Sequence, residues 1–332
     1  MEPICRQVHV RVPATSANLG SGFDTIGLAL DYHDELTFTL SSDPSNRAAQ
    51  VFIQGEGEDT LPRDETHLVV STFRKACQTF GLGKVGFIMD AHNNIPQARG
   101  MGSSAEAIVA GIAAAAAFAQ DGDLNRDSVF ELAAAIEGHP DNVAPAVYGG
   151  MTASWNFDTA EGVGSVPIPG GEPLHGGFHT VKYVVAPAVT AAVFVPDYEL
   201  STQKARQALP AEVAHRDAVF NVSRVALMAA AMNPAALAAG EDPNALLYTA
   251  TQDRLHQPYR KGLMEPSWRL IERFRARGFA AAVSGAGPCV LVLHHGDAAD
   301  QINEIAAEEL ASGHWKVLHL PIDTRGVSVE RR

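Results

Sequence analysis

Apolar residues alternate with polar ones near the start of the chain and recur at helical spacing in later segments. Val8, Val10 and Val12 alternate with His9 and Arg11, a pattern that predicts a half-buried strand. Short apolar segments predict further strands at residues 35–40, 50–54, 85–90, 151–155, 183–186, 192–195, 280–284, 289–293 and 316–320. Helical periodicity and capping residues predict helices at residues 64–80, 103–119, 127–138, 201–208, 212–231, 265–277 and 298–312.

The order of these elements and one Gly- and Pro-rich interval predict the fold class and its division. Strands and helices follow one another without strict alternation, which favours an α+β fold over a doubly wound sheet. Residues 158–177 are rich in Gly and Pro, so we expect a long loop there. A chain of 332 residues can form two domains. We therefore expect one domain in residues 1–170 and a second in residues 171–332.

The composition argues against several classes of protein. The formal net charge of −13 excludes nucleic acid as an expected partner, because phosphate backbones are bound by clustered Lys and Arg. The longest apolar stretch, residues 107–119, is shorter than the roughly 18 to 20 residues of a membrane span, so no membrane partner is expected. The three cysteines are widely separated and predict neither disulfides nor a zinc site. With no signal-peptide core at its start, the chain is expected in the cytoplasm.

A Gly-Ser segment at the start of the long apolar helix is the clearest candidate for chemistry. In Arg99-Gly-Met-Gly-Ser-Ser-Ala105, two glycines let the backbone approach a ligand, and the free amides of a helix start attract anions. The alternative is an ordinary Gly-rich turn in which Ser caps the helix. The chain has no G-x-x-x-x-G-K-[ST] motif and no H-R-D or D-F-G set, so a nucleotide would bind here in another way.

Three further segments carry polar residues in Gly- or Pro-rich surroundings. The first is Pro13-Ala-Thr-Ser-Ala-Asn-Leu-Gly-Ser-Gly-Phe-Asp24, which follows the first predicted strand. The second is Glu137-Gly-His-Pro-Asp-Asn142, which is followed by Ala-Pro-Ala-Val-Tyr-Gly-Gly. The third is Ser284-Gly-Ala-Gly-Pro288, between two predicted strands. In this order and spacing, the segments resemble the signature motifs of the GHMP small-molecule kinases.

The resemblance extends over most of the chain and implies a fold and an activity. The segments STQKAR at residues 201–206 and LHQPYR at residues 255–260 are similar to the branch of that superfamily that phosphorylates L-homoserine. It implies a two-domain GHMP kinase fold, with an N-terminal domain like ribosomal protein S5 domain 2 and a ferredoxin-like C-terminal domain. The N-terminal domain would hold the ATP phosphate loop, the C-terminal domain would contribute substrate-binding arginines, and the active site would lie between them.

The resemblance implies ATP and Mg²⁺ as cofactors. The residues expected to bind ATP are Pro96, Gln97, Ala98, Arg99, Gly100, Met101, Gly102, Ser103, Ser104, Ala105 and Thr202. The expected metal ligands are Ser104 and Glu131, while Glu137 is closer to the motif but matches the family less well. Two residues depart from the family pattern near this loop: Met101 stands for Leu, and Glu106 stands for Ala. Glu106 suits the helix dipole but would repel phosphate if it pointed inward.

The resemblance also implies a set of substrate-binding residues. Arg206 and Arg260 match arginines that bind the homoserine carboxylate, for which their forked guanidinium groups are well suited. Asp24 and Asn18 are candidates for its amino group, although Asn18 could serve only as an Asx turn. His139 and Asn142 are expected to line the pocket, with Asn142 orienting the hydroxyl.

The implied mechanism is direct in-line phosphoryl transfer, in which positioning and charge neutralisation carry most of the catalysis. Asn142 and Asp24 are the expected catalytic residues, and Asp24 as a general base is a hypothesis. The resemblance further implies a homodimer and inhibition by threonine, an isomer of homoserine. Two alternatives remain: a GHMP kinase that acts on another small alcohol, and a nucleotide- or amino-acid-binding regulator without catalysis.

Overall fold

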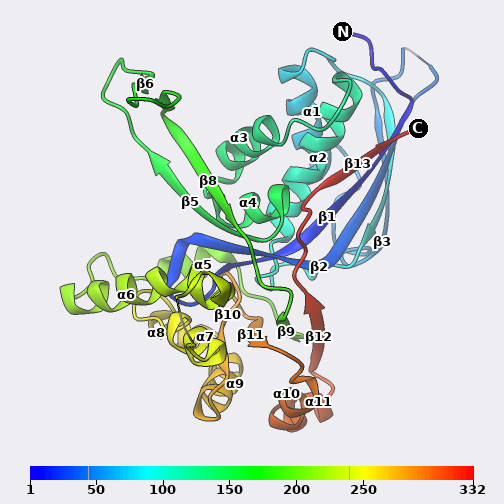
Figure 1. Ribbon diagram of the computed structural model, residues 1–332. Helices are drawn as coiled ribbons and strands as arrows, with labels where there is room; N and C mark the ends of the chain where they lie inside the picture. Colours follow the sequence, from blue (N-terminus) through cyan, green and yellow to red (C-terminus); the bar gives the residue numbers. More distant parts are fainter. Residues whose placement is uncertain (44, 239) are drawn as a thin grey trace.

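The computed structural model, which describes residues 1–43, 45–238 and 240–332, contains two large sheets that lie one above the other in Figure 1. The upper, seven-stranded sheet has the order β13-β1-β2-β4-β3, and β5 pairs with both β2 and β8. Neighbouring strands of this sheet are antiparallel, except that β3 and β4 are parallel. Its strands are β1 (Gln7–Asn18), β2 (Gly22–Leu40), β3 (Ala49–Gly55), β4 (Phe87–Asn93), β5 (Met151–Phe157), β8 (Gly177–Tyr183) and β13 (Ser328–Arg331).

Four helices pack against this sheet: α1 (Leu68–Thr79), α2 (Ser103–Ala119), α3 (Arg126–Glu137) and α4 (Pro140–Tyr148). The central one, α2, is apolar on all sides and almost wholly buried, as expected of a helix enclosed by others. A side chain at Gly111 would overlap Thr72 and the backbone of α1, so this glycine permits the close contact of the two helices. The prediction of a helix at residues 103–119 is confirmed.

The lower sheet has four antiparallel strands in the order β10-β11-β9-β12. They are β9 (Val189–Pro196), β10 (Ala280–Val283), β11 (Val290–His295) and β12 (Trp315–Pro321). This order, with helices between β9 and β10 and between β11 and β12, is that of a ferredoxin-like domain. The helices of this half are α5 (Thr202–Gln207), α6 (His215–Met232), α7 (Pro243–Ala250), α8 (Gln257–Arg260), α9 (Glu265–Ala276), α10 (Ala299–Ile305) and α11 (Ala307–Ala311), with one-turn 3-10 helices at Pro234–Ala236 and Lys261–Leu263.

The chain does not leave the upper sheet at residue 170, where the sequence predicted the boundary between the two domains. The predicted loop is the tip of a hairpin that projects from the molecule, with two short strands, β6 (Ser165–Val166) and β7 (Leu174–His175). After the tip, β8 returns along β5 in the upper sheet, so the predicted strand at residues 183–186 lies too late in the sequence. The chain end also returns to this sheet as β13, because Ser328 to Arg331 pair with β1.

Several elements differ from the predictions. Pairing begins in β2 at residue 22 rather than 35, and β2 bends so that its first half pairs with β5 and its second half with β4. The short helices α4, α7 and α8 were not predicted, and each has Pro in its first turn. The predicted helix at residues 298–312 is divided into α10 and α11. Within the described ranges, no helix has the length and apolar character needed to span a membrane.

Candidate active site

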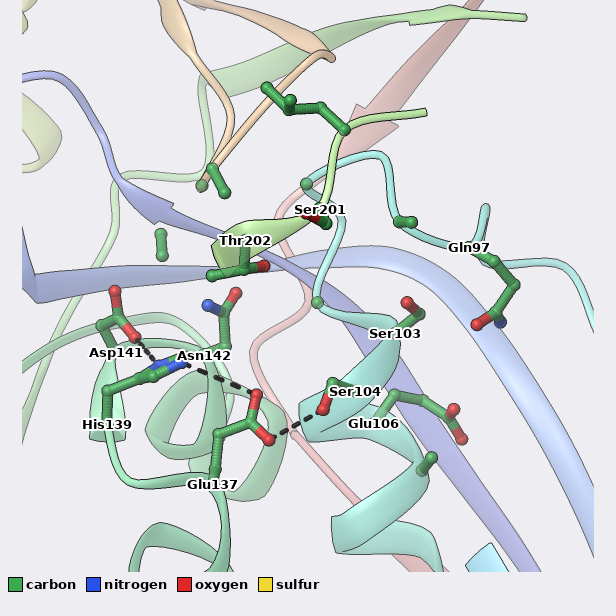
Figure 2. A pocket seen from close by; sticks show the side chains of 18 of the residues that line it. Gln97, Ser103, Ser104, Glu106, Glu137, His139, Asp141, Asn142, Ser201 and Thr202 are labelled. Atoms are coloured by element: carbon green, nitrogen blue, oxygen red, sulfur yellow. Dashed lines mark hydrogen bonds and ion pairs between the residues drawn. The ribbon is translucent and has the colours of Figure 1, made fainter. Parts of the chain in front are cut away.

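A cavity of about 390 Å³ is lined by residues from both halves of the chain. The upper half contributes the β1–β2 loop and the starts of α2 and α4, which approach one another in Figure 2. The lower half contributes α5, the end of α8 and the turn between β10 and β11. The predicted site residues that line it are Asn18, Asp24, Gln97, Ala98, Gly100, Gly102, Ser103, Ser104, His139, Asn142, Thr202, Arg206 and Arg260.

The start of α2 presents free backbone amides to this cavity. Gly102, the residue before the helix, has a φ of 75° and provides no side-chain cap. A side chain at Gly102 would overlap the hydroxyl of Thr15, and one at Gly100 would overlap the carbonyl of Ser284, so both positions require glycine. Because the first amides of a helix attract anions, this turn is suited to a phosphate group.

The carboxylate beside the phosphate loop is that of Glu137, not that of Glu131 as the sequence predicted. The hydroxyl of Ser104 donates to Oε2 of Glu137 over 2.8 Å (Figure 2). Glu131 lies earlier in α3 and lines a separate cavity with Asp127 and Tyr148. Six residues along a helix place two side chains on different faces, which is why Glu131 cannot share the position of Glu137.

His139 lies between two carboxylates. Its Nδ1 is 2.8 Å from Oδ1 of Asp141, and its Nε2 is 3.8 Å from Oε1 of Glu137. The hydrogen bond to Asp141 raises the pKa of the imidazole, although burial opposes this effect. Asp141 therefore positions His139, and its side chain does not cap α4.

Asn142 is held by a residue that the sequence did not single out. The hydroxyl of Thr15 donates to Oδ1 of Asn142 over 2.9 Å, so the amide group Nδ2 of Asn142 remains as the donor for a ligand. Thr15 is almost completely buried, which fixes this arrangement. The residue lies within the motif of residues 13–24, but only the spatial contact reveals its role.

Asp24 and Arg206 join the two halves across the cavity. Two nitrogens of the Arg206 guanidinium donate to the two oxygens of Asp24, each over 2.9 Å. This bidentate pairing raises the pKa of Arg206. Asn18 also lines the cavity, but its Oδ1 accepts from the backbone N–H of Asp24 and its Nδ2 donates to the carbonyl of Gly285. Asn18 thus holds the loop in place, through a residue six positions along the chain and not through the two-residue step of an Asx turn.

Arg260 is a buried cation, with only 2% of its surface exposed. Its Nε donates to the carbonyl of Ala205, and its Nη1 lies 3.1 Å from Nδ1 of His256. Burial, and next the nearby charge of Arg206, lower its pKa. His256 donates from Nε2 to the carbonyl of Gly20 and stacks on Phe23 at 5.0 Å, so it ties Arg260 to the β1–β2 loop.

Five of the predicted ATP and metal residues do not line the cavity. They are Pro96, Arg99, Met101, Ala105 and Glu131. Met101 and Ala105 point into the core. Arg99 points the other way, towards the carbonyl of Asp197 and the carboxylate of Glu56. Some residues of this turn face the cavity and others face the core. The continuous sequence motif therefore contains both cavity-lining and core residues.

Glu106, the departure from the family pattern, is buried at the cavity wall. It interacts with Asp34 of β2, whose Oδ1 accepts from the backbone N–H groups of Asn94 and Ile95. Burial and the neighbouring Asp34 raise the pKa of Glu106 well above its ordinary range. Burial raises the pKa of Asp34 to about 6, against the lowering effect of its two backbone partners. The two carboxyl groups therefore do not both carry a charge near neutral pH.

Comparison with known proteins identifies the family. Residues 67–150 match the model of the GHMP kinases N terminal domain, and residues 234–312 match that of the GHMP kinases C terminal. A homoserine kinase of Leifsonia xyli subsp. xyli is 43% identical, over 98% of this chain and 93% of that protein. The chain belongs to the homoserine kinase family. The predicted GHMP kinase fold is thereby confirmed.

Other homoserine kinases give the same result. The protein of Clavibacter michiganensis subsp. michiganensis is 42% identical, over 98% of this chain and 94% of that protein. A crystal structure of homoserine kinase from Cytophaga hutchinsonii has a TM-score of 0.80 at 24% identity and covers 99% of both chains. A mevalonate kinase structure has a TM-score of 0.66 at 13% identity, over 96% of this chain and 99% of that chain, so the fold is shared beyond the homoserine kinase family.

Proposed function

We propose that this member of the homoserine kinase family transfers the γ-phosphoryl group of ATP to the side-chain hydroxyl of L-homoserine, a step in threonine biosynthesis. The observation that carries the proposal is a single cavity lined by the uncapped start of α2 and by Arg206 and Arg260. A triphosphate and an amino-acid carboxylate are both anions, and each has its own partner here although the chain as a whole is acidic.

Ser104 and Glu137 are the residues that we expect to hold Mg²⁺. Their side-chain oxygens lie 2.8 Å apart beside the free amides of α2. Mg²⁺ takes one or two protein oxygens and completes its octahedral shell with phosphate oxygens and water, so this pair fits the ion. When bound, the ion would neutralise charge on the phosphates. Glu137 takes the role that the sequence gave to Glu131, because Glu131 lines another cavity.

The other end of the cavity suits a zwitterionic amino acid. We assign the carboxylate to Arg206 and Arg260 and the ammonium group to Asp24. Asn18 keeps Asp24 in position through the hydrogen bond to its backbone, so we assign it no direct contact. Asn142 offers its Nδ2 to the substrate hydroxyl, because Thr15 occupies Oδ1. His139 forms the adjacent wall.

The transfer itself needs positioning more than a strong base. The hydroxyl oxygen of homoserine forms a bond to the γ-phosphorus as the bond from phosphorus to the β,γ-bridging oxygen breaks, and the transition state is loose. ADP leaves with the bridging oxygen, and the hydroxyl proton passes to a phosphate oxygen or to water. We assign Asp24 to binding and not to proton transfer, because two hydrogen bonds from Arg206 hold its carboxylate in place beside the substrate ammonium group. Asn142 would instead orient the hydroxyl for in-line attack.

The remaining expectations stay predictions. These are a homodimer, inhibition by threonine and a cytoplasmic location. Cys5, Cys77 and Cys289 are free thiols, in keeping with a reducing compartment.

A substrate panel with ADP detection tests the proposed function. We expect turnover with L-homoserine and at least a hundredfold lower kcat/KM with mevalonate and galactose, which lack an α-amino-acid group for Arg206, Arg260 and Asp24. Equal turnover of mevalonate, or none of homoserine, would contradict the proposal. If calorimetry detected ATP binding without any transfer, the alternative of a regulator that has lost catalysis would be correct.

A further inference from the structure

The aromatic ring of Phe23 lies among three nitrogen-rich side chains of the site without lining the cavity itself. The guanidinium carbon of Arg260 is 5.2 Å from the ring centroid, and that of Arg206 is 5.9 Å from it. The imidazole of His256 stacks on the same ring, with the centroids 5.0 Å apart and 23° between the planes. Phe23 therefore lies against both arginines to which we assign the substrate carboxylate.

The backbone of the β1–β2 loop sends two adjacent side chains in different directions. Asp24 has a φ of 53°, in the left-handed region that residues other than glycine seldom adopt. Its carboxylate lines the cavity, whereas the ring of Phe23 does not. Oδ1 of Asn18 holds this turn by accepting from the backbone N–H of Asp24 over 2.9 Å. A left-handed residue that is held in this way indicates a functional constraint. Here it places a carboxylate and an aromatic ring around the same pair of arginines.

The two guanidinium groups repel each other. Both line one cavity, and the charge of Arg206 is, after burial, the main cause that lowers the pKa of Arg260. Arg206 is paired with Asp24. In the described ranges, by contrast, the hydrogen bonds of Arg260 go to backbone carbonyls and to Nδ1 of His256. Arg260 is thus a buried cation without a carboxylate in direct contact.

An aromatic ring supplies part of what Arg260 lacks. The face of the ring has a negative electrostatic potential, which attracts a guanidinium group within about 6 Å of the centroid. The ring is rigid, and its position is fixed by the stacked His256, whose Nε2 donates to the carbonyl of Gly20 over 2.8 Å. Phe23 therefore opposes the separation of the two like charges before any substrate is bound.

We propose that Phe23 is a positioning residue for the substrate carboxylate: its ring keeps the guanidinium groups of Arg206 and Arg260 in the orientation in which both donate to one carboxylate. The proposal rests on the proposed function for the identity of the substrate. The gain is preorganisation, because groups that are already in place lose little freedom when the ligand binds. Without the ring the two cations would move apart, and part of the binding free energy would go into drawing them together.

Phe23→Leu tests this role, because leucine keeps an apolar side chain but has no aromatic face. We expect KM for homoserine to rise about tenfold, the value of two cation–π contacts, while KM for ATP changes less than about twofold. Phe23→Tyr keeps the aromatic face and should restore both values to within about threefold of the wild type. Phe52→Leu, at an exposed position of β3, is the control. Equal rises of both KM values would show a general structural defect and contradict the proposal.

A cycle with Arg260→Met shows whether the ring acts through the arginines. Methionine keeps most of the length of the side chain without its charge, so the buried site stays filled. In this background the arginine pair no longer exists, and Phe23→Leu should raise KM for homoserine by no more than about threefold. Multiplication of the two single losses would mean that the ring acts independently of Arg260, which would overturn the proposal.

Calorimetric titration with L-homoserine separates failure of this proposal from failure of the proposed function. If the wild type did not bind homoserine, the proposed function would be wrong, and the role of Phe23 with it. If the wild type and Phe23→Leu bound homoserine equally, only the role of Phe23 would be wrong.

If Phe23→Leu does not fold, the ring can be tested in place. A trifluorinated phenylalanine incorporated at position 23 keeps the shape of the ring but weakens the negative potential of its face, so it should lower the affinity for homoserine about threefold. Unchanged affinity would overturn the proposal.

Discussion

Each functional side chain of the site is oriented by a second residue. Asp24 is paired with Arg206, Asn142 with Thr15, and Arg260 with His256. Such pairing fixes the direction in which the remaining donor or acceptor points, which is the positioning on which phosphoryl transfer depends. Substitution of Thr15 or His256 should therefore alter the kinetics, although neither residue is assigned a contact with a substrate.

Asp24→Asn tests the role of Asp24 at the scale of one residue. We expect KM for homoserine to rise roughly ten- to hundredfold, because the ammonium group loses a charge-assisted hydrogen bond and Arg206 loses its partner. The turnover number kcat should stay within about fivefold, since in-line transfer depends on positioning and charge neutralisation, and we assign Asp24 to substrate binding. Steady-state kinetics measures both. A thousandfold fall of kcat with unchanged homoserine binding would establish Asp24 as the base, and Asp59→Asn on an exposed loop is the control.

Thr15→Val tests the orientation of Asn142. The substitution keeps the shape of the side chain but deletes the hydroxyl that donates to Asn142, so its amide group is free to rotate. We expect kcat to fall about tenfold, the value of a lost buried hydrogen bond. Thr15→Ser, which retains the hydroxyl, should remain within about threefold of the wild type. Identical kinetics of the Val and Ser variants would show that Thr15 has no part in orienting Asn142.

At the scale of elements, long apolar or periodic segments were predicted, and short or Gly-rich ones were not. The helix at residues 103–119 has the predicted bounds because Ser103 follows the Gly-rich turn and the apolar run of residues 107–119 is long enough to exclude a strand. The first half of β2 escaped prediction because it lies in a Gly-rich segment whose pairing with β1 is interrupted by irregularities. The helices α4, α7 and α8 have four to nine residues, too few to show a helical period.

The contact of β2 with α2 predicts a dependence of stability on pH. Burial raises the pKa of Asp34 from 3.8 to about 6, so the folded protein binds more protons than the unfolded chain between these values. The contribution of this group to the free energy of unfolding is therefore greatest below pH 4 and is lost as the pH rises through 6, by at most about 1.4 kcal/mol per unit.

Urea unfolding of the wild type and of Asp34→Asn between pH 4 and 7 measures this effect. Asparagine can keep the acceptor for Asn94 and Ile95 but cannot ionise. The variant should gain stability relative to the wild type as the pH rises. A constant difference over this range would mean that Asp34 titrates normally.

At the scale of the whole molecule, the sequence predicted which motifs meet but not how the halves are interleaved. The four glycine-rich or histidine-containing motifs and the two arginines do converge on one cavity. Chain distance does not show which helix face points to the cavity: Glu131 lines a separate cavity, and Glu137 lies beside Ser104. The return of β13 to the upper sheet could not be predicted, because residues 328–331 are too few to show a strand pattern.

The central claim is that one cleft holds the triphosphate at the start of α2 and the amino acid at the two arginines. Steady-state kinetics of Ser104→Ala and Arg206→Ala, with homoserine and ATP varied in turn, tests it most directly. We predict that Arg206→Ala raises KM for homoserine at least tenfold and changes KM for ATP less than twofold. Ser104→Ala should lower kcat and weaken ATP–Mg²⁺ binding while leaving homoserine binding unchanged. If the variants showed the same pattern, or if neither altered its own substrate, the proposed division of the cleft would be wrong.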